Sequence, residues 1–240
     1  MERLDKIIST GGGVSRSDAR KLILKGRVTV NEKTVRDIAF KVDPDADKIT
    51  LNGEDISYKK YIYLIMNKPK GVLTATEDKN KQTVIDLIPG ELRRRDLFPV
   101  GRLDKDTTGL LIITNDGDFA HQLLSPNKKI PKKYFVTLDG VVGEDLIPKF
   151  AAGLTLADGT KLSSAGLEIG EDSHTALVTI TEGKYHQIKR MFGLFSLGVN
   201  ELKRVSFAGL DLPETLLESE VRELTVNELR CIKNAKIVTK

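Results

Sequence analysis

The feature that most constrains the fold is a polar loop that leads straight into an apolar strand, between residues 100 and 118. The loop holds two carboxylates, an arginine and two threonines, and the apolar run after it ends at a turn sequence, Asn115-Asp116-Gly117. A buried strand is a rigid support, so polar groups at its end are well placed for catalysis. The residues alone leave two interpretations of Asp104 open: a catalytic carboxylate, or a loop aspartate that pairs with Arg102.

Apolar runs and their spacing predict further elements on both sides of this segment. Strands are expected at 62–66, 109–114, 133–138, 175–181 and 201–206, and helices at 83–88, 118–125, 144–152, 185–195 and 225–232. Strands and helices do not alternate regularly, so residues 59–240 are expected to form an α+β domain on a mixed sheet.

Residues 1–58 are expected to form a separate small α/β domain. Helical spacing runs from Arg3 to Ser9, and a second helix is expected between an N-cap at Ser15 and a stop at Gly26. Short strands follow at 28–30 and 49–51. Nine bases face four acids between residues 1 and 36, whereas six acids face two lysines between 37 and 55. This separation gives one basic face, which suits phosphate binding, although a solvated helix surface has the same pattern.

The composition excludes several classes of protein. One cysteine, Cys231, rules out an internal disulfide framework and a cysteine-rich zinc site. No apolar run approaches the roughly 20 residues that span a bilayer, and the N-terminus lacks a secretory signal. We therefore expect a soluble cytoplasmic protein with no membrane partner. The formal charge of +4 and the pI near 9.0 fit a nucleic-acid partner, but many other enzymes share them.

The polar loop and its strand contain a longer pattern. Residues 101–111 read Gly-Arg-Leu-Asp-x-x-Thr-x-Gly-Leu-Leu, and residues 114–117 read Thr-Asn-Asp-Gly. The pattern is similar to the central motif of bacterial ribosomal pseudouridine synthases, above all the branch that modifies small-subunit ribosomal RNA. Further blocks agree in the same order, at 67–71, 132–134, 183–191, 204–210 and 222–225.

The first 55 or so residues resemble the small RNA-binding domain named after ribosomal protein S4. The two resemblances together cover nearly the whole chain. They imply a pseudouridine synthase catalytic domain, on a mixed and largely antiparallel sheet with flanking helices, preceded by a small α/β RNA-binding domain.

The resemblance implies that three residues carry the chemistry. Asp104 aligns with the family's catalytic aspartate, which acts on the uridine as a nucleophile or as a base. Tyr134 aligns with a tyrosine whose ring stacks on the uracil and whose phenol is a candidate to remove the proton from carbon 5; a core aromatic is the ordinary alternative. Lys189 aligns with the basic partner of the aspartate, a role that falls to Arg190 if the alignment moves by one. Substrate and product are isomers, so no cofactor is expected.

Other residues are expected to touch RNA. Arg102 is a candidate to fill the place of a flipped base. His186 is expected to shape the pocket or contact RNA, and the three histidines lack the spacing of metal ligands. The RNA contacts expected in the N-terminal domain are Arg3, Ser15, Arg16, Ser17, Lys21, Lys25 and Arg27.

Three functions are compatible with these features. The first is isomerisation of one uridine in 16S ribosomal RNA, and the second is the same chemistry on 23S ribosomal RNA. The third is a non-catalytic, RNA-binding ribosome-assembly factor, against which the combination of Asp104, Tyr134 and Lys189 speaks. In each case the expected partner is ribosomal RNA, either free or within an assembling particle, and the expected state is a monomer.

Overall fold

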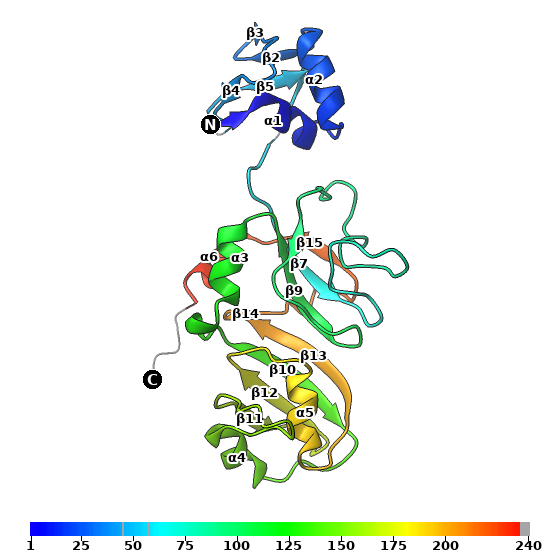
Figure 1. Ribbon diagram of the computed structural model, residues 1–240, viewed down its shortest axis with the longest axis vertical. Helices are drawn as coiled ribbons and strands as arrows, with labels where there is room; N and C mark the ends of the chain where they lie inside the picture. Colours follow the sequence, from blue (N-terminus) through cyan, green and yellow to red (C-terminus); the bar gives the residue numbers. More distant parts are fainter. Residues whose placement is uncertain (45, 57, 236–240) are drawn as a thin grey trace. The chain divides into compact units, whose positions relative to one another are not determined.

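The computed structural model describes residues 1–44, 46–56 and 58–235 (Figure 1). The chain divides into two compact units, Met1–Ile62 and Tyr63–Lys240. The division falls a few residues after the boundary expected at residue 58. No helix in the described residues is long and apolar enough to cross a membrane.

The N-terminal unit packs two helices against short antiparallel strands. Its helices are α1 (Leu4–Gly11) and α2 (Arg16–Leu24). One sheet has the order β3-β2-β5-β6, and β1 pairs with β4. The strands are β1 (Glu2–Arg3), β2 (Val28–Val30), β3 (Lys33–Thr34), β4 (Lys41–Val42), β5 (Ile49–Leu51) and β6 (Glu54–Asp55).

The core of this unit follows from the apolar spacing of the two helices. Leu4 and Ile8 of α1 and Ile23 of α2 are fully buried together with Val28 of β2. Ser15 caps α2, because its side chain accepts a hydrogen bond of 3.1 Å from the Asp18 N–H. The cap and the two helices agree with the sequence prediction.

The second unit is built on one mixed sheet. Within the described residues its order is β11-β12-β10-β13-β9-β7-β15, with β14 added to β13 and β8 added to β9. The strands are β7 (Tyr63–Lys68), β8 (Phe98–Pro99), β9 (Thr108–Thr114), β10 (Lys132–Leu138), β11 (Gly166–Ile169), β12 (Thr175–Ile180), β13 (Val199–Phe207), β14 (Leu210–Asp211) and β15 (Val221–Glu223). Neighbouring strands are antiparallel except β13 and β9, which are parallel. The α+β prediction is confirmed.

Helices flank this sheet (Figure 1). They are α3 (Gly117–Leu124), the 3-10 turn η1 (Pro126–Lys128), α4 (Leu146–Ala152), α5 (Gln187–Gly193) and α6 (Val226–Lys233). Phe119 of α3 and Ile232 of α6 join a buried cluster with Ile65 of β7 and Ile112 of β9. Asp116, in the turn after β9, caps α3 by accepting a hydrogen bond of 3.0 Å from the Phe119 N–H.

One helix prediction is wrong and another is too long. Thr83 forms an isolated β-bridge with Leu73, and residues 84–87 form turns. The Asp86 carboxylate accepts hydrogen bonds from both the N–H and the hydroxyl of Thr83. Such a side-chain contact competes with helical hydrogen bonding. The helix expected at 185–195 covers only α5, since His186 has a left-handed φ of 47° that a continuous helix does not allow.

Candidate active site

A cavity of about 720 Å³ opens in the second unit, on the strands at the centre of its sheet. This volume falls in the range of small-molecule sites, roughly 300–1,000 Å³. Its wall includes the loop before β9, part of β10, the segment between β12 and α5, and three residues of β13. Its polar lining includes the side chains of Arg102, Asp104, Lys132, Tyr134, Glu182, His186 and Arg204.

The loop that carries Asp104 is fixed by hydrogen bonds from both ends. The Thr74 hydroxyl donates to the Leu103 carbonyl at 2.8 Å and accepts from the Leu103 N–H at 3.2 Å. The Thr107 N–H donates to the Asp104 carbonyl at 3.1 Å. Asp104 therefore sits on a backbone with little freedom, while its side chain keeps 35% of its surface exposed.

A buried lysine anchors the same loop. The ammonium of Lys68, which is fully buried, donates to the carbonyls of Thr107 and Pro69, both at 3.0 Å. Burial lowers the pKa of Lys68 to about 8, while the nearby charges of Asp106 and Asp104 oppose that shift. Lys68 thus holds the loop through main-chain carbonyls, away from the cavity.

Gly109 lets the parallel strands β9 and β13 approach each other. Its φ of +101° favours glycine, and an added Cβ would lie 2.3 Å from the Arg204 carbonyl oxygen. Gly109 is paired with Arg204 across these strands. The glycine thereby joins the end of the Asp104 loop to the strand that brings Arg204 to the cavity.

Tyr134 lies in the same cavity as Asp104, as the resemblance implies. It belongs to β10, is 7% exposed, and pairs with Arg204 of β13 next to a bulge between Lys133 and Tyr134. Bulges change the direction of a side chain relative to a regular ladder. The two candidate catalytic residues are thus brought together from separate parts of the chain.

Asp104 lies closest to His186 among the basic side chains with which a contact is recorded. Its Nε2 lies 3.7 Å from Oδ1 of Asp104, which is ion-pair distance rather than a close hydrogen bond. The imidazole stacks on Tyr185 with 3.9 Å between ring centroids. The side-chain contact of Asp104 is therefore made with His186, and Arg102 lies exposed on the cavity wall.

The structure corrects the expected pairing of Lys189. Its ammonium pairs with Asp106, two residues beyond Asp104, and the neighbouring Arg190 pairs with Asp158. Successive residues of a helix point about 100° apart, and each of these two side chains reaches an acid other than Asp104. The hydrogen bond from Lys189 lowers the pKa of Asp106. The pKa of Asp158 is lowered to about 2, first by the Thr160 N–H and hydroxyl and then by Arg190.

Two cavity cations were not singled out from the sequence. Arg204 is 2% exposed; its Nε donates to the Leu110 carbonyl at 2.7 Å, and its Nη2 lacks a hydrogen-bond partner in the described structure. Burial, and then the charge of Arg204, lower the pKa of Lys132 to about 8, against the opposing effect of Glu182. Strand periodicity was the available signal, because it places Arg204 on the same face as the buried Leu202.

The residues expected to bind RNA in the N-terminal unit lie on and around α2. Ser15 and Ser17 are linked through their hydroxyls at 2.8 Å, and Lys21 pairs with Asp18. Lys25 and Arg27 are exposed. Arg3 and Arg16 both contact Asp5. In the described parts of both units, no three His, Cys, Asp or Glu side chains gather as a metal site requires.

Comparison with known proteins identifies the family of this chain. The family described as RNA pseudouridylate synthase matches residues 62–193, and the S4 domain matches residues 2–54. A crystal structure of a pseudouridylate synthase is 34% identical, with a TM-score of 0.67, over 97% of this chain and 100% of that one. The chain belongs to the RNA pseudouridylate synthase family and is a pseudouridine synthase with an N-terminal S4 domain.

Three relatives extend along almost the full length of the chain. An uncharacterised RNA pseudouridine synthase of Bacillus subtilis is 42% identical, over 96% of this chain and 98% of the relative. Ribosomal small subunit pseudouridine synthase A of Escherichia coli is 38% identical, over 96% and 99%. Ribosomal large subunit pseudouridine synthase B of Bacillus subtilis is 36% identical, over 97% and 96%.

Proposed function

We propose that this enzyme isomerises one specific uridine of 16S ribosomal RNA to pseudouridine, in the cytoplasm, as a monomer and without a cofactor. The observation that carries the proposal is the cavity shared by Asp104 and Tyr134, whose volume suits a nucleoside. The relatives named for small- and large-subunit RNA are 38% and 36% identical. The preference for 16S RNA therefore depends on the small-subunit character of the motif at 101–117.

The proposed chemistry rearranges bonds within one nucleotide. The bond between uracil N1 and ribose C1′ breaks, and a bond between uracil C5 and C1′ forms after the base has turned. As a nucleophile, the Asp104 carboxylate forms a bond to C1′ that breaks again when the C5–C1′ bond forms. As a base, it removes a proton from the ribose and returns it once the new bond has formed. The proton on C5 then leaves to a base, for which Tyr134 is the candidate, and N1 gains a proton. Atoms and charge balance without an external reactant.

The remaining cavity residues have supporting roles in this proposal. His186 orients the Asp104 carboxylate, the role first expected of Lys189. Lys189 and Arg190 keep the start of α5 in place through Asp106 and Asp158. Arg102, which is exposed at the cavity wall, fills the space that the flipped uridine leaves in the RNA.

The target is tested by mapping pseudouridine in ribosomal RNA from cells with and without the gene. We expect one position in 16S RNA to lose the modification and to regain it with the wild-type gene but not with Asp104→Asn. Loss at a 23S position instead would establish the large-subunit alternative, which the 36% identical relative makes the second candidate. No change in either RNA would contradict the proposal.

A further inference from the structure

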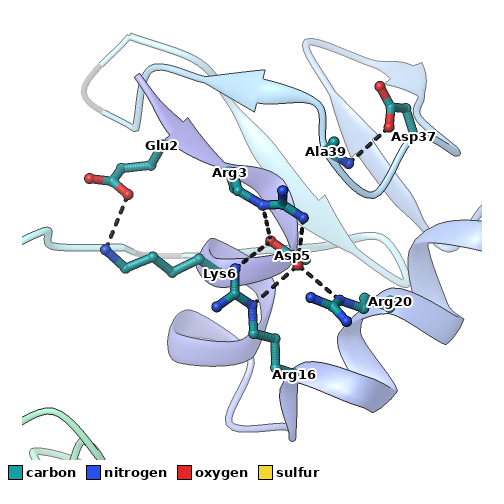
Figure 2. A network of polar contacts seen from close by, with 8 residues as sticks. All are labelled: Glu2, Arg3, Asp5, Lys6, Arg16, Arg20, Asp37 and Ala39. Carbon is teal, nitrogen blue, oxygen red and sulfur yellow. Dashed lines mark hydrogen bonds and ion pairs between the residues drawn. The ribbon is translucent and has the colours of Figure 1, made fainter.

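A buried carboxylate in the N-terminal unit holds three arginines together. The side chain of Asp5, in the first turn of α1, is fully buried, whereas those of Arg3, Arg16 and Arg20 are 41%, 52% and 47% exposed. Arg3 and Arg16 each donate two hydrogen bonds to this carboxylate and Arg20 donates one, at 3.0–3.3 Å (Figure 2). The acid is hidden from solvent and the three bases are not.

The cluster keeps an excess of positive charge. Burial alone would raise the pKa of Asp5, but the hydrogen bonds from Arg3, Arg16 and Arg20 outweigh it and hold the pKa far below its usual value. The carboxylate is therefore ionised at any physiological pH. Asp5 faces three guanidinium groups, and the charge of Asp37 also acts on Arg3. The three positive charges still exceed these two negative ones, so net positive charge remains available to an anion from solvent.

The three guanidinium groups also keep hydrogen-bond donors for a ligand. Each group carries five N–H donors, and Asp5 accepts at most two from any one of them. Among the described residues, their recorded hydrogen bonds go to Asp5. The neighbouring acids take none of the recorded hydrogen bonds of these arginines: Glu2 pairs with Lys6, and Asp37 accepts from the Ala39 N–H at 2.8 Å (Figure 2).

We propose that Asp5 is a positioning residue that gathers Arg3, Arg16 and Arg20 into one site for a backbone phosphate of RNA. Without the carboxylate, like charges would drive the three heads apart. With it, they are ordered before binding, so less side-chain entropy is lost on association. Guanidinium groups match phosphate oxygens in bidentate geometry. The site requires that the enzyme bind RNA, but it does not depend on which uridine is modified.

The proposal predicts that loss of the Asp5 charge weakens RNA binding, which is the opposite of what electrostatics alone predicts. Removing an acid from an RNA-binding surface should strengthen binding by simple electrostatics. We expect Asp5→Asn to weaken it instead, by about tenfold, because the arginine heads lose their common acceptor. Asp55→Asn is the matched control: it removes an exposed acid of the same unit, paired with Lys48, and should leave affinity equal or slightly higher. The measurement is fluorescence anisotropy of a labelled RNA stem-loop with the full-length protein.

Arg20 supplies a second pair of variants that leaves the other arginines on Asp5. Arg20→Gln should weaken RNA binding and flatten the plot of log Kd against log salt by roughly 0.7–0.9, the value for one phosphate contact. Arg20→Lys keeps the charge but not the planar donor group, so its affinity should fall several-fold with an unchanged slope. A role limited to folding would move neither the slope nor the Arg20→Lys affinity.

Two further readouts separate positioning from folding and from catalysis. Circular dichroism follows the fold of each variant; if Asp5→Asn unfolds the N-terminal unit, the two Arg20 variants decide the question. Tritium release at saturating ribosomal RNA should keep the wild-type rate in Arg20→Gln, while the KM rises. A folded Asp5→Asn that binds the stem-loop as tightly as wild type would overturn the proposal. Unchanged affinity and slope in Arg20→Gln would overturn it equally.

Discussion

Single residues in the cavity are held by contacts that the sequence does not reveal. Asp104 depends on Thr74 and Lys68 for the position of its loop, and it meets His186 rather than Lys189. The periodicity of β13 predicts that Arg204 points inward, but not which atoms it meets. The contacts of Asp5 could likewise not be predicted from the sequence. Its partners Arg16 and Arg20 lie on α2 and reach it because α2 packs on α1. Pairings of this kind depend on tertiary packing.

The charged ammonium of Lys132 is predicted to lower the free energy of unfolding near neutral pH. The folded pKa of about 8 is lower than the value of 10.5 for an unperturbed lysine. The unfolded chain therefore binds more protons between these two values, and stability rises with pH across that window. Below pH 8 the cost of the buried charge is fully present. We expect Lys132→Met to raise the free energy of unfolding by up to about 3 kcal/mol at pH 7, with the gain vanishing near pH 10.5.

The neighbouring Lys133 provides the control for this prediction. It lies on the same strand but forms an exposed ion pair with Glu168, so Lys133→Met should change stability by less than about 0.5 kcal/mol. Urea unfolding followed by circular dichroism at pH 7, 8, 9 and 10 measures both variants. A constant difference between Lys132→Met and wild type at all four values would contradict the proposed titration.

At the scale of elements, the close approach of β9 to β13 joins the loop that carries Asp104 to the sheet. Gly109→Ala would place a Cβ 2.3 Å from the Arg204 carbonyl oxygen at a φ of +101°. Because a backbone atom cannot yield there, we expect a loss of about 3 kcal/mol or more in stability, together with loss of activity. Gly117→Ala is the control, since its Cβ meets nothing within 4 Å at the first position of α3. Equal melting temperatures for Gly109→Ala and Gly117→Ala would contradict this account.

Elements with strong apolar periodicity were predicted well from the sequence. The strands β7, β9, β10, β12 and β13 fall close to the expected ranges, because each is a run of apolar or alternating residues long enough to be distinctive. The segment 83–88 has a comparable apolar pattern, yet Asp86 directs its hydrogen bonds to Thr83 and produces turns. The hydrogen bonds between Asp86 and Thr83 therefore replaced the helix that the apolar pattern predicts.

At the scale of the whole molecule, we propose that the S4 unit supplies phosphate contacts to RNA while the second unit carries the chemistry. Deleting residues 1–62 should weaken RNA affinity and flatten its salt dependence, because the phosphate contacts of the S4 unit are lost. The turnover rate at saturating RNA should change little, since Asp104, Tyr134 and His186 all belong to the second unit. Anisotropy titrations at several salt concentrations test this. An unchanged slope would argue against a docking role for the S4 unit.

Asp104 is the residue on which the whole account depends. The most direct test is tritium release from ribosomal RNA labelled at uracil carbon 5, with wild type and Asp104→Asn compared at equal RNA occupancy. We predict release by wild type and none above background by Asp104→Asn, with equal RNA affinity and equal thermal stability for the two proteins. Equal release by both, or none by wild type, would contradict the assignment of Asp104 as the catalytic carboxylate.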